Sequence, residues 1–143
     1  MNLTTYRTVP STVVPLLLGA IVACSSVTDP HALPATVETT RIFTLLPPPA
    51  VTAVPDTLRI TGAIGLNEPC YRFSASAFQR DTVVVILIAQ RRPGICTQNL
   101  AAFSYTITVT GAQPGTFPFR LIHELRAEFS VQETALEQTV QLP

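Results

Sequence analysis

Two histidines are the side chains of this sequence best suited to proton transfer near neutral pH. His123 is followed directly by Glu124, and neighbouring residues of a strand point to opposite faces of a sheet, so this pair could not act together. His31 lies in a proline-rich segment that would leave its imidazole in solvent, whereas a general base must be held within about 3 Å of its proton donor. The histidines therefore do not predict a catalytic dyad.

The carboxylates and the common catalytic motifs lead to the same conclusion. The chain contains no Lys, which excludes Schiff-base chemistry and the phosphate-binding Walker loop. It also lacks the patterns Gly-x-Ser-x-Gly, Gly-x-Gly-x-x-Gly, His-Glu-x-x-His and Cys-x-x-Cys. The acidic residues are scattered through turns and the tail, and they form no pair of the kind a glycosidase needs: Asp56, Glu68, Asp81, Glu124, Glu128, Glu133 and Glu137. We expect a non-enzymatic protein with no cofactor and no bound metal.

Two adjacent arginines, Arg91 and Arg92, precede Pro93 and Gly94 in a turn that ends at Cys96. Two guanidinium groups could bind a carboxylate or a phosphate in a bidentate manner. Charged residues beside an apolar strand also act as solvated gatekeepers against aggregation. Both interpretations remain open.

Length and charge restrict the remaining functions. The chain has 143 residues, enough for one small domain with extensions. Nine Arg balance nine acidic residues and only 13% of the residues are charged, so a nucleic-acid partner is not supported. Apolar residues make up 47% of the chain and can form a core, while 13 Pro against 6 Gly favour extended segments over helices.

The amino terminus has the pattern of an export signal. No charged side chain occurs from Thr8 to Thr28, and the densest apolar part runs from Val13 to Ala23. A membrane-spanning helix needs roughly 20 apolar residues, and Pro15 interrupts this segment near its start. Residues 1–23 are therefore predicted to be a cleaved signal peptide.

The end of this segment, Ile21, Val22, Ala23 and Cys24, resembles a relaxed bacterial lipobox. The resemblance implies cleavage before Cys24, attachment of diacylglycerol to its sulfur and acylation of the new amine. Several acyl chains would hold the mature protein on a membrane. Ser25 stands where an Asp would retain an enteric lipoprotein at the inner membrane, so the outer membrane is favoured. The alternative is an ordinary secretory signal with an incidental Cys.

The other two cysteines are interpreted in the light of that resemblance. Three Cys in an exported chain leave one unpaired, and lipidation of Cys24 would account for it. Cys70 and Cys96 would then form a disulfide in an oxidising compartment. A metal site is the weaker alternative, because His123 is the one imidazole of the predicted domain and structural zinc prefers four ligands.

Residues 24–55 contain six prolines, a density that favours an extended tether. Within this segment, the β-branched and apolar residues from Val37 to Leu46 could instead form a strand that docks on the edge of the domain. The sequence leaves both the tether and the edge strand open.

From Thr57 onward the chain alternates between apolar and polar residues with period two, as half-buried strands do. The clearest case is Phe103 to Val109, which precedes the turn Gly111 to Gly115. Other strands are expected at 57–64, 71–77, 81–90 and 117–121. In the tail, Leu125, Phe129 and Leu136 could lie on one face of a helix, but we expect a strand that pairs with the strand at Phe117.

The segment Phe103 to Val109, the turn after it and residues 116–123 resemble the paired late strands of bacterial immunoglobulin-like modules. The chain has no Trp, and 26 residues separate Cys70 from Cys96, too few for the usual cross-sheet bridge of immunoglobulin domains. The resemblance implies an all-β fold, a small antiparallel immunoglobulin-like β-sandwich over residues 56–143.

Seven consecutive apolar residues, Val83 to Ala89, would give one strand two apolar rows. If Val83, Val85 and Leu87 face the core, then Val84, Ile86 and Ile88 form a second row. The segment Val37 to Leu46 or the tail could cover that row, because monomers seldom leave such rows bare. An uncovered row would instead suit a protein partner.

The sequence thus favours a lipid-anchored protein of the bacterial cell envelope whose sandwich binds or spaces an envelope protein. One alternative is a protease inhibitor that presents the loop from Arg91 to Cys96. The other is a small-ligand binder or an enzyme with an unrecognised cleft near His123.

Overall fold

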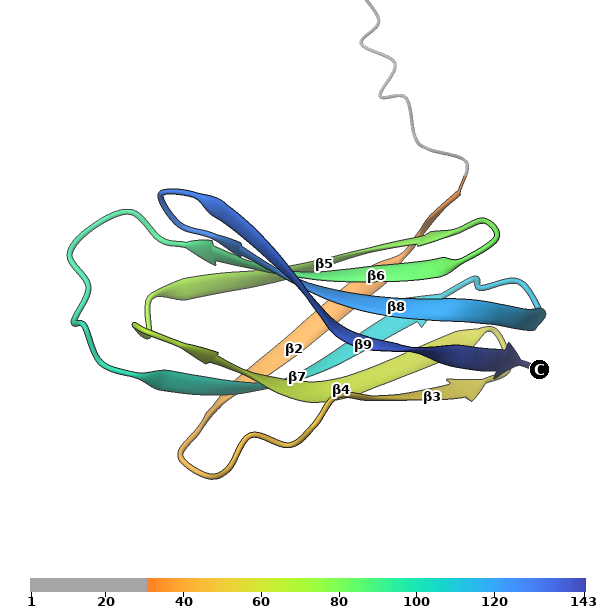
Figure 1. Ribbon diagram of the computed structural model, residues 1–143, viewed down its shortest axis with the longest axis horizontal. Helices are drawn as coiled ribbons and strands as arrows, with labels where there is room; N and C mark the ends of the chain where they lie inside the picture. The colour runs from red at the N-terminus through yellow and green to blue at the C-terminus, as the bar shows by residue number, and fades with distance from the viewer. Residues whose placement is uncertain (1–30) are drawn as a thin grey trace, which may run out of the picture.

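A computed structural model describes residues 31–143, which form a sandwich of two β-sheets (Figure 1). The strands are β1 (Ala32–Leu33), β2 (Ala35–Ile42), β3 (Ala50–Val54), β4 (Thr57–Leu66), β5 (Tyr71–Gln79), β6 (Val83–Arg91), β7 (Ala101–Thr110), β8 (Gly115–Arg126) and β9 (Ser130–Leu142). The expected all-β sandwich is confirmed. Residues 31–143 include no helix with the length and hydropathy needed to cross a membrane.

The first sheet has the strand order β1-β5-β6-β8-β9, and the second has the order β2-β7-β4-β3. Neighbouring strands are antiparallel, with the exception of β6 and β8, which are parallel. The parallel pair arises because the chain crosses from β6 into the second sheet as β7 and returns as β8. Each crossing reverses the direction of the chain, so β6 and β8 run the same way.

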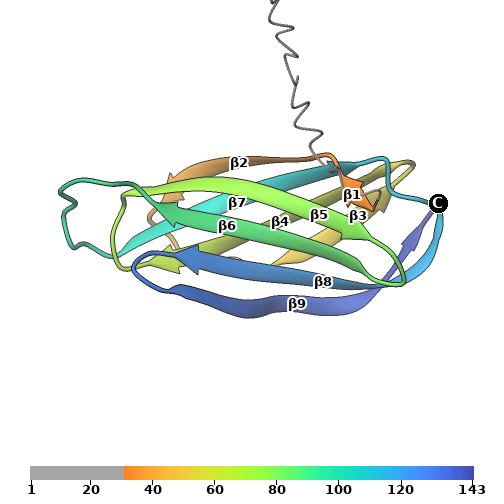
Figure 2. The ribbon, with the colours of Figure 1, turned by 90° about the horizontal axis from the view of Figure 1, so that it is seen from above.

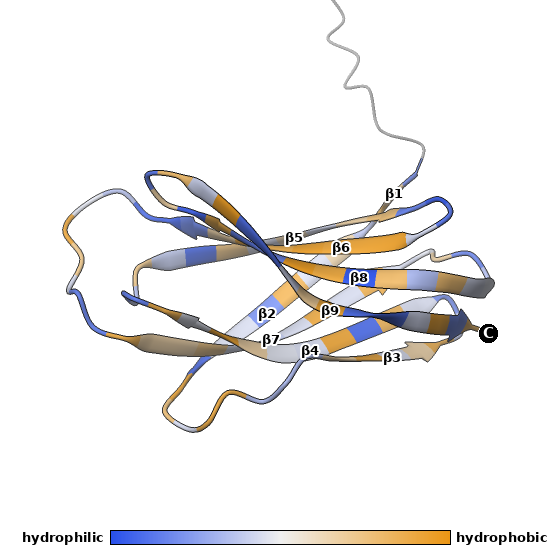
Figure 3. Cartoon of the chain, in the orientation of Figure 1, coloured by the Kyte–Doolittle hydropathy of each residue, from blue (hydrophilic) through white to orange (hydrophobic). Residues whose placement is uncertain are grey.

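The core lies between the two sheets and follows the period-two pattern. On β7, Tyr105, Ile107 and Val109 are buried. Strand β6 is hydrophobic along most of its length (Figure 3), and one of its two rows faces the core. Fully buried side chains from four strands, β4, β6, β7 and β8, fill the interior: Leu58, Ile60, Val83, Val85, Leu87, Ile107, Val109, Phe119 and Leu121. Burying each of these side chains stabilises the fold by about 1.5–3 kcal/mol.

The sandwich begins before residue 56, so the segment expected to be a tether contributes strands β1, β2 and β3. Strand β2 lies at an edge beside β7, which agrees with the edge-strand alternative. It ends at Ile42 rather than Leu46, ahead of Pro47, Pro48 and Pro49, which have no amide N–H to donate to a ladder. Apolar residues of β2 and β3 pack against the core, which explains why this part of the chain belongs to the domain.

The tail forms a strand, and the helical alternative is wrong. Strand β9 pairs with β8 from Gly115 opposite Leu142 to Arg126 opposite Ser130, as expected for a strand beside Phe117. A bulge interrupts the register after Leu121, because Leu121 lies opposite Leu136 whereas Ile122 lies opposite Thr134. Because β8 already pairs with β6, the pairing with β9 gives the backbone donors and acceptors on the other side of β8 their hydrogen-bond partners.

The two ends of the sandwich differ. The connections 43–49, 67–70, 92–100 and 127–129 lie at one end, which we name the loop end. At the other end, the entry end, the described chain begins at β1 and finishes after β9. Figure 2 shows the long connection after β6 at one extremity and the carboxyl terminus at the other.

Candidate functional site

A disulfide fixes the longest connection of the loop end. Cys70 and Cys96 are bonded, with their Cα atoms 6.0 Å apart, so the expected pairing is confirmed. The backbone N–H of Arg92 also donates to the carbonyl of Cys70 at 2.9 Å. The connection 92–100 is therefore held near its start and at Cys96, while the residues around Ile95 project into solvent.

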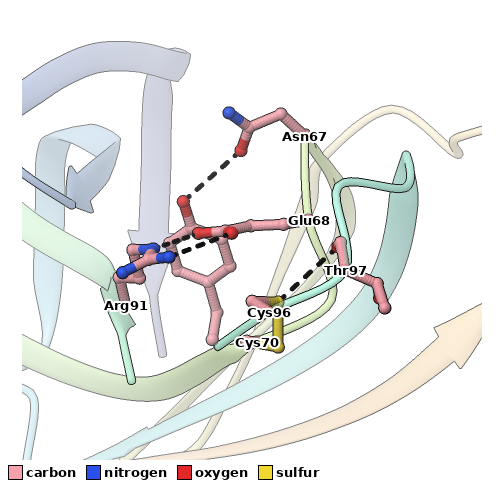
Figure 4. The surroundings of a disulfide bond; sticks show 7 residues. Asn67, Glu68, Cys70, Arg91, Cys96 and Thr97 are labelled. Atoms are coloured by element: carbon pink, nitrogen blue, oxygen red, sulfur yellow. Dashed lines mark hydrogen bonds and ion pairs between the residues drawn. A yellow bond between two sulfur atoms is a disulfide. The ribbon is translucent and has the colours of Figure 1, made fainter. Parts of the chain in front are cut away.

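Beside the disulfide, Arg91 is bound to Glu68 (Figure 4). Its Nε and Nη2 atoms donate to the two oxygens of the buried Glu68 carboxylate. The hydrogen bond and the charge of Glu68 raise the pKa of Arg91. Burial and the nearby Glu68 raise the pKa of Tyr71, whose hydroxyl donates to Asn67 at 3.5 Å. This polar cluster positions the two chain segments that the disulfide joins.

Arg91 and Arg92 do not form the expected clamp. Because they are adjacent on an extended backbone, their side chains diverge. Arg91 forms an ion pair with Glu68. Arg92 is exposed and, together with Arg72, borders a cavity that Arg91 does not line. The sequence could not reveal this arrangement, because Glu68 lies 23 positions before Arg91.

A second buried carboxylate, Glu124, fastens the hairpin of β8 and β9. It accepts hydrogen bonds from Arg126, Ser130 and Gln132. These bonds, led by the one from Arg126, lower the pKa of Glu124 although burial opposes the shift. Sequence reasoning missed this role. Only the spacing of Glu124 and Arg126, which puts both side chains on one face of a strand, could have indicated it.

Large apolar side chains are exposed at the loop end. Ile95 and Leu45 are essentially fully exposed, at 106% and 94%. The others at this end come from the connection after β2, the connection before β7 and the β8–β9 hairpin: Phe43, Leu46, Leu100, Phe129 and Val131. Val54, near the entry end, is the one further large apolar residue of this kind among residues 31–143.

A shallow apolar groove of about 480 Å³ lies among these residues. Gly65, which has no side chain, and Ala102, which has only a methyl group, are register partners on β4 and β7 and line the groove. Ile42, Leu46 and Leu100 border it. The sequence did not predict this site, because Leu45 and Leu46 belong to the segment Val37 to Leu46, for which it allows either a tether or an edge strand. Only the three consecutive prolines that follow indicated an irregular connection.

The row of Val84, Ile86 and Ile88 lies on the outer face of the first sheet. These residues are half-buried, and β5 and β8 flank them. The two segments expected to cover the row do not do so: β2 is in the opposite sheet, and β9 is in the same sheet beyond β8. Among the strands of residues 31–143, none crosses this face (Figure 2).

The histidine of the domain has a structural partner. The Nε2 atom of His123 lies 2.9 Å from the Tyr105 hydroxyl, and the two rings meet edge to face. Burial lowers the pKa of His123 and raises the pKa of Tyr105 to about 12. His123 does not interact with Glu124, which agrees with the opposite orientation expected for adjacent strand residues.

Residues 31–143 contain no cluster of three or more His, Cys, Asp or Glu side chains that could hold a metal ion. Cys24, the predicted lipidation site, lies outside the described residues. Comparison with protein-family models, with curated proteins and with solved structures found no match.

Proposed function

We propose that this chain is a lipid-anchored, non-enzymatic protein of the bacterial cell envelope whose sandwich binds another protein through its loop end. The lipobox-like segment ending at Cys24 and the preceding apolar leader support the anchor. The bond between Cys70 and Cys96 supports an extracytoplasmic location, because disulfides persist in oxidising compartments.

The observation that carries the binding function is the exposure of apolar side chains from three separate connections at one end. Chains of this size seldom expose large clusters of apolar side chains, and clusters of this kind mark interaction surfaces. Removing such a surface from water contributes roughly 25 cal/mol per Å² of apolar area. Ile95 and Leu100 lie on a connection fixed by a disulfide, which lowers the conformational entropy lost on binding.

The position of the anchor relative to the loop end fits this function. Seven residues separate Cys24 from the beginning of β1, a length that reaches at most about 25 Å when fully extended. The anchor would therefore hold the entry end close to the membrane. Strand β8, with 12 residues, is about 40 Å long, so the loop end can be directed away from the membrane toward a partner.

Site-specific photo-crosslinking in intact cells tests the proposal. A photoreactive amino acid replaces Ile95 in one strain and Val54, an exposed apolar residue near the entry end, in a control strain. We expect a covalent adduct with another protein at position 95 and none at position 54. Adducts that contain only this chain, or equal adducts at both positions, would refute binding through the loop end.

The anchor has its own test, because Cys24→Ala removes the lipidated thiol. We expect the wild-type protein to fractionate with membranes and to incorporate labelled palmitate, and the variant to lose both properties. Cys24→Ser provides a second variant with a side chain closer in size to Cys. Recovery of wild-type protein in the cytosol with Met1 retained would contradict the anchor and the export signal together.

Protease inhibition is a second candidate, favoured by the exposure of Ile95 beside the disulfide-bonded Cys96. A loop held in this way can occupy a protease cleft without losing its shape after cleavage. The geometry selects proteases that accept an aliphatic side chain, since Arg91 is engaged with Glu68. Pancreatic elastase is a suitable probe: inhibition that is lost in Ile95→Asp supports this candidate, and rapid cleavage without inhibition excludes it.

A further inference from the structure

Strand β5 has an unpaired edge over most of its length. Its inner neighbour is β6 from Tyr71 to Gln79, but on the other side β1 pairs only with Ala77 and Phe78. Pro34 follows β1, and the chain then continues as β2 in the second sheet. Among residues 31–143, no strand pairs with 71–76 on that side.

The backbone of this edge offers hydrogen-bonding groups to an additional strand. The N–H of Gln79 donates to the carbonyl of His31 on the β1 side. Because successive residues of a strand direct their backbone groups to alternate sides, Phe73 and Ala75 present N–H and C=O groups to the same side as Gln79. A strand that continued the line of β1 would find these groups in the correct register.

A crevice of about 360 Å³ runs along this edge, between β5 and the free edge of β2. Val37 and Thr39 line it from β2, and Tyr71 and Phe73 line it from β5. Phe103 closes the apolar part, with its ring centroid 5.1 Å from that of Phe73. The crevice can therefore take an aliphatic side chain from a strand that lies along β5.

Two arginines give the same crevice a positive charge. Arg72 and Arg92 both border it, and both side chains are exposed. Neither forms an ion pair with any carboxylate of residues 31–143. The nearby Glu68 is neutralised by Arg91. Two guanidinium groups without acidic partners favour an anionic ligand, and carboxylates match their geometry.

From these observations, we propose that the open edge of β5 binds an extended acidic segment of a partner protein by strand addition. Strand addition combines backbone hydrogen bonds with pockets for alternate side chains. On β5, Arg72, Ser74 and Ser76 face outward, whereas Phe73 faces the crevice. The added segment therefore carries acidic residues on its outer face and small aliphatic residues on its inner face. This site borders the loop end, to which Arg92 belongs, but none of the exposed apolar side chains of the loop end line it, and it does not depend on the lipid anchor.

The probe is a synthetic peptide, acetyl-Ser-Glu-Val-Glu-Val-Glu-Ser-amide, added to the full chain carrying Cys24→Ser. We expect amide hydrogen exchange at Phe73 and Ala75 to slow at least tenfold at saturation, and their NMR amide signals to shift. A peptide with Lys in place of each Glu tests the charge requirement, and a peptide with N-methylated Val residues tests the backbone hydrogen bonds. Both control peptides should bind at least tenfold more weakly.

A charge reversal in the protein completes the test. Arg72→Glu with Arg92→Glu should weaken binding of the acidic peptide at least tenfold. Arg59→Glu, a charge reversal on the second sheet, should leave the affinity unchanged.

The proposal is overturned if the acidic peptide does not bind at millimolar concentration, if it binds at β3 or β9, or if the Lys peptide binds equally well. Protection of Phe73 that rises with protein concentration in the absence of peptide would assign the edge to a second copy of this chain. None of these outcomes depends on crosslinking at Ile95, so failure of the two proposals can be distinguished.

Discussion

Removal of the disulfide is the perturbation whose effect the structure defines best. Cys70 and Cys96 flank the hairpin of β5 and β6 and close a loop with a sequence separation of 26. We consider the double substitution Cys70→Ser and Cys96→Ser in a chain that also carries Cys24→Ser. The third substitution is present in the reference protein as well, so that no other thiol can exchange.

The expected loss follows from the entropy of the unfolded chain. For a separation of 26, the chain-entropy relation gives about 12 cal/mol/K, or about 3.5 kcal/mol at 25 °C. Domains of this size have a free energy of unfolding of roughly 5–15 kcal/mol, so the loss is a large part of the total. It corresponds to a decrease in Tm of about 14 °C at roughly 4 °C per kcal/mol.

Urea unfolding followed by circular dichroism measures this quantity. Reduction of the reference protein should reproduce the loss, whereas reductant should not affect the Ser variant. A loss below about 1 kcal/mol would refute the reasoning. It would mean that the pair of Arg91 and Glu68, together with the bond from Arg92 to Cys70, holds the two segments together without the covalent bond.

Two further predictions concern the core. Because burial lowers the pKa of His123 below 6.5, against the opposing effect of Glu133, the unfolded state takes up the proton first. The free energy of unfolding should therefore fall as the pH decreases from about 7 toward 5, and His123→Gln should flatten this part of the pH profile, measured by urea unfolding. An unchanged slope in the variant would contradict the assignment. Separately, Gly62→Ala would place a Cβ against the buried phenol of Tyr105 and 3.1 Å from the Pro49 Cα. It should therefore destabilise the fold by about 1–3 kcal/mol, whereas Gly65→Ala, with 3.5 Å to Leu46, should be nearly neutral in thermal unfolding.

The strands themselves were largely predictable from the sequence. Apolar and polar residues alternate from Phe103 to Val109, and this pattern can be read from seven consecutive residues. It distinguishes a half-buried strand, which has one apolar and one polar row, from a helix or a loop. The same reasoning placed strands around Leu58, Phe73 and Phe119, and it placed the final strand beside β8. The disulfide was also expected, although its prediction relied on a resemblance at Cys24 rather than on geometry.

The neighbours of each strand were not predictable in the same way. Whether Ala35–Ile42 is a tether or an edge strand depends on a pairing with β7, whose register partners lie at least sixty residues away. The burial of Glu68 and Glu124 likewise depends on partners that only the folded chain brings to them. Alternation reports which side of a strand is apolar, but it contains no information about what lies on that side.

The amino-acid sequence by itself determined that this chain forms half-buried strands, has two bonded cysteines and carries no recognisable catalytic set. Tertiary structure alone decided which edges and faces remain open: the apolar tips at the loop end, the uncovered row on β6 and the unpaired edge of β5. The physical reason is that strand formation follows from the spacing of residues along the chain. Exposure depends on all the long-range pairings of both sheets, and no single segment of the sequence encodes them.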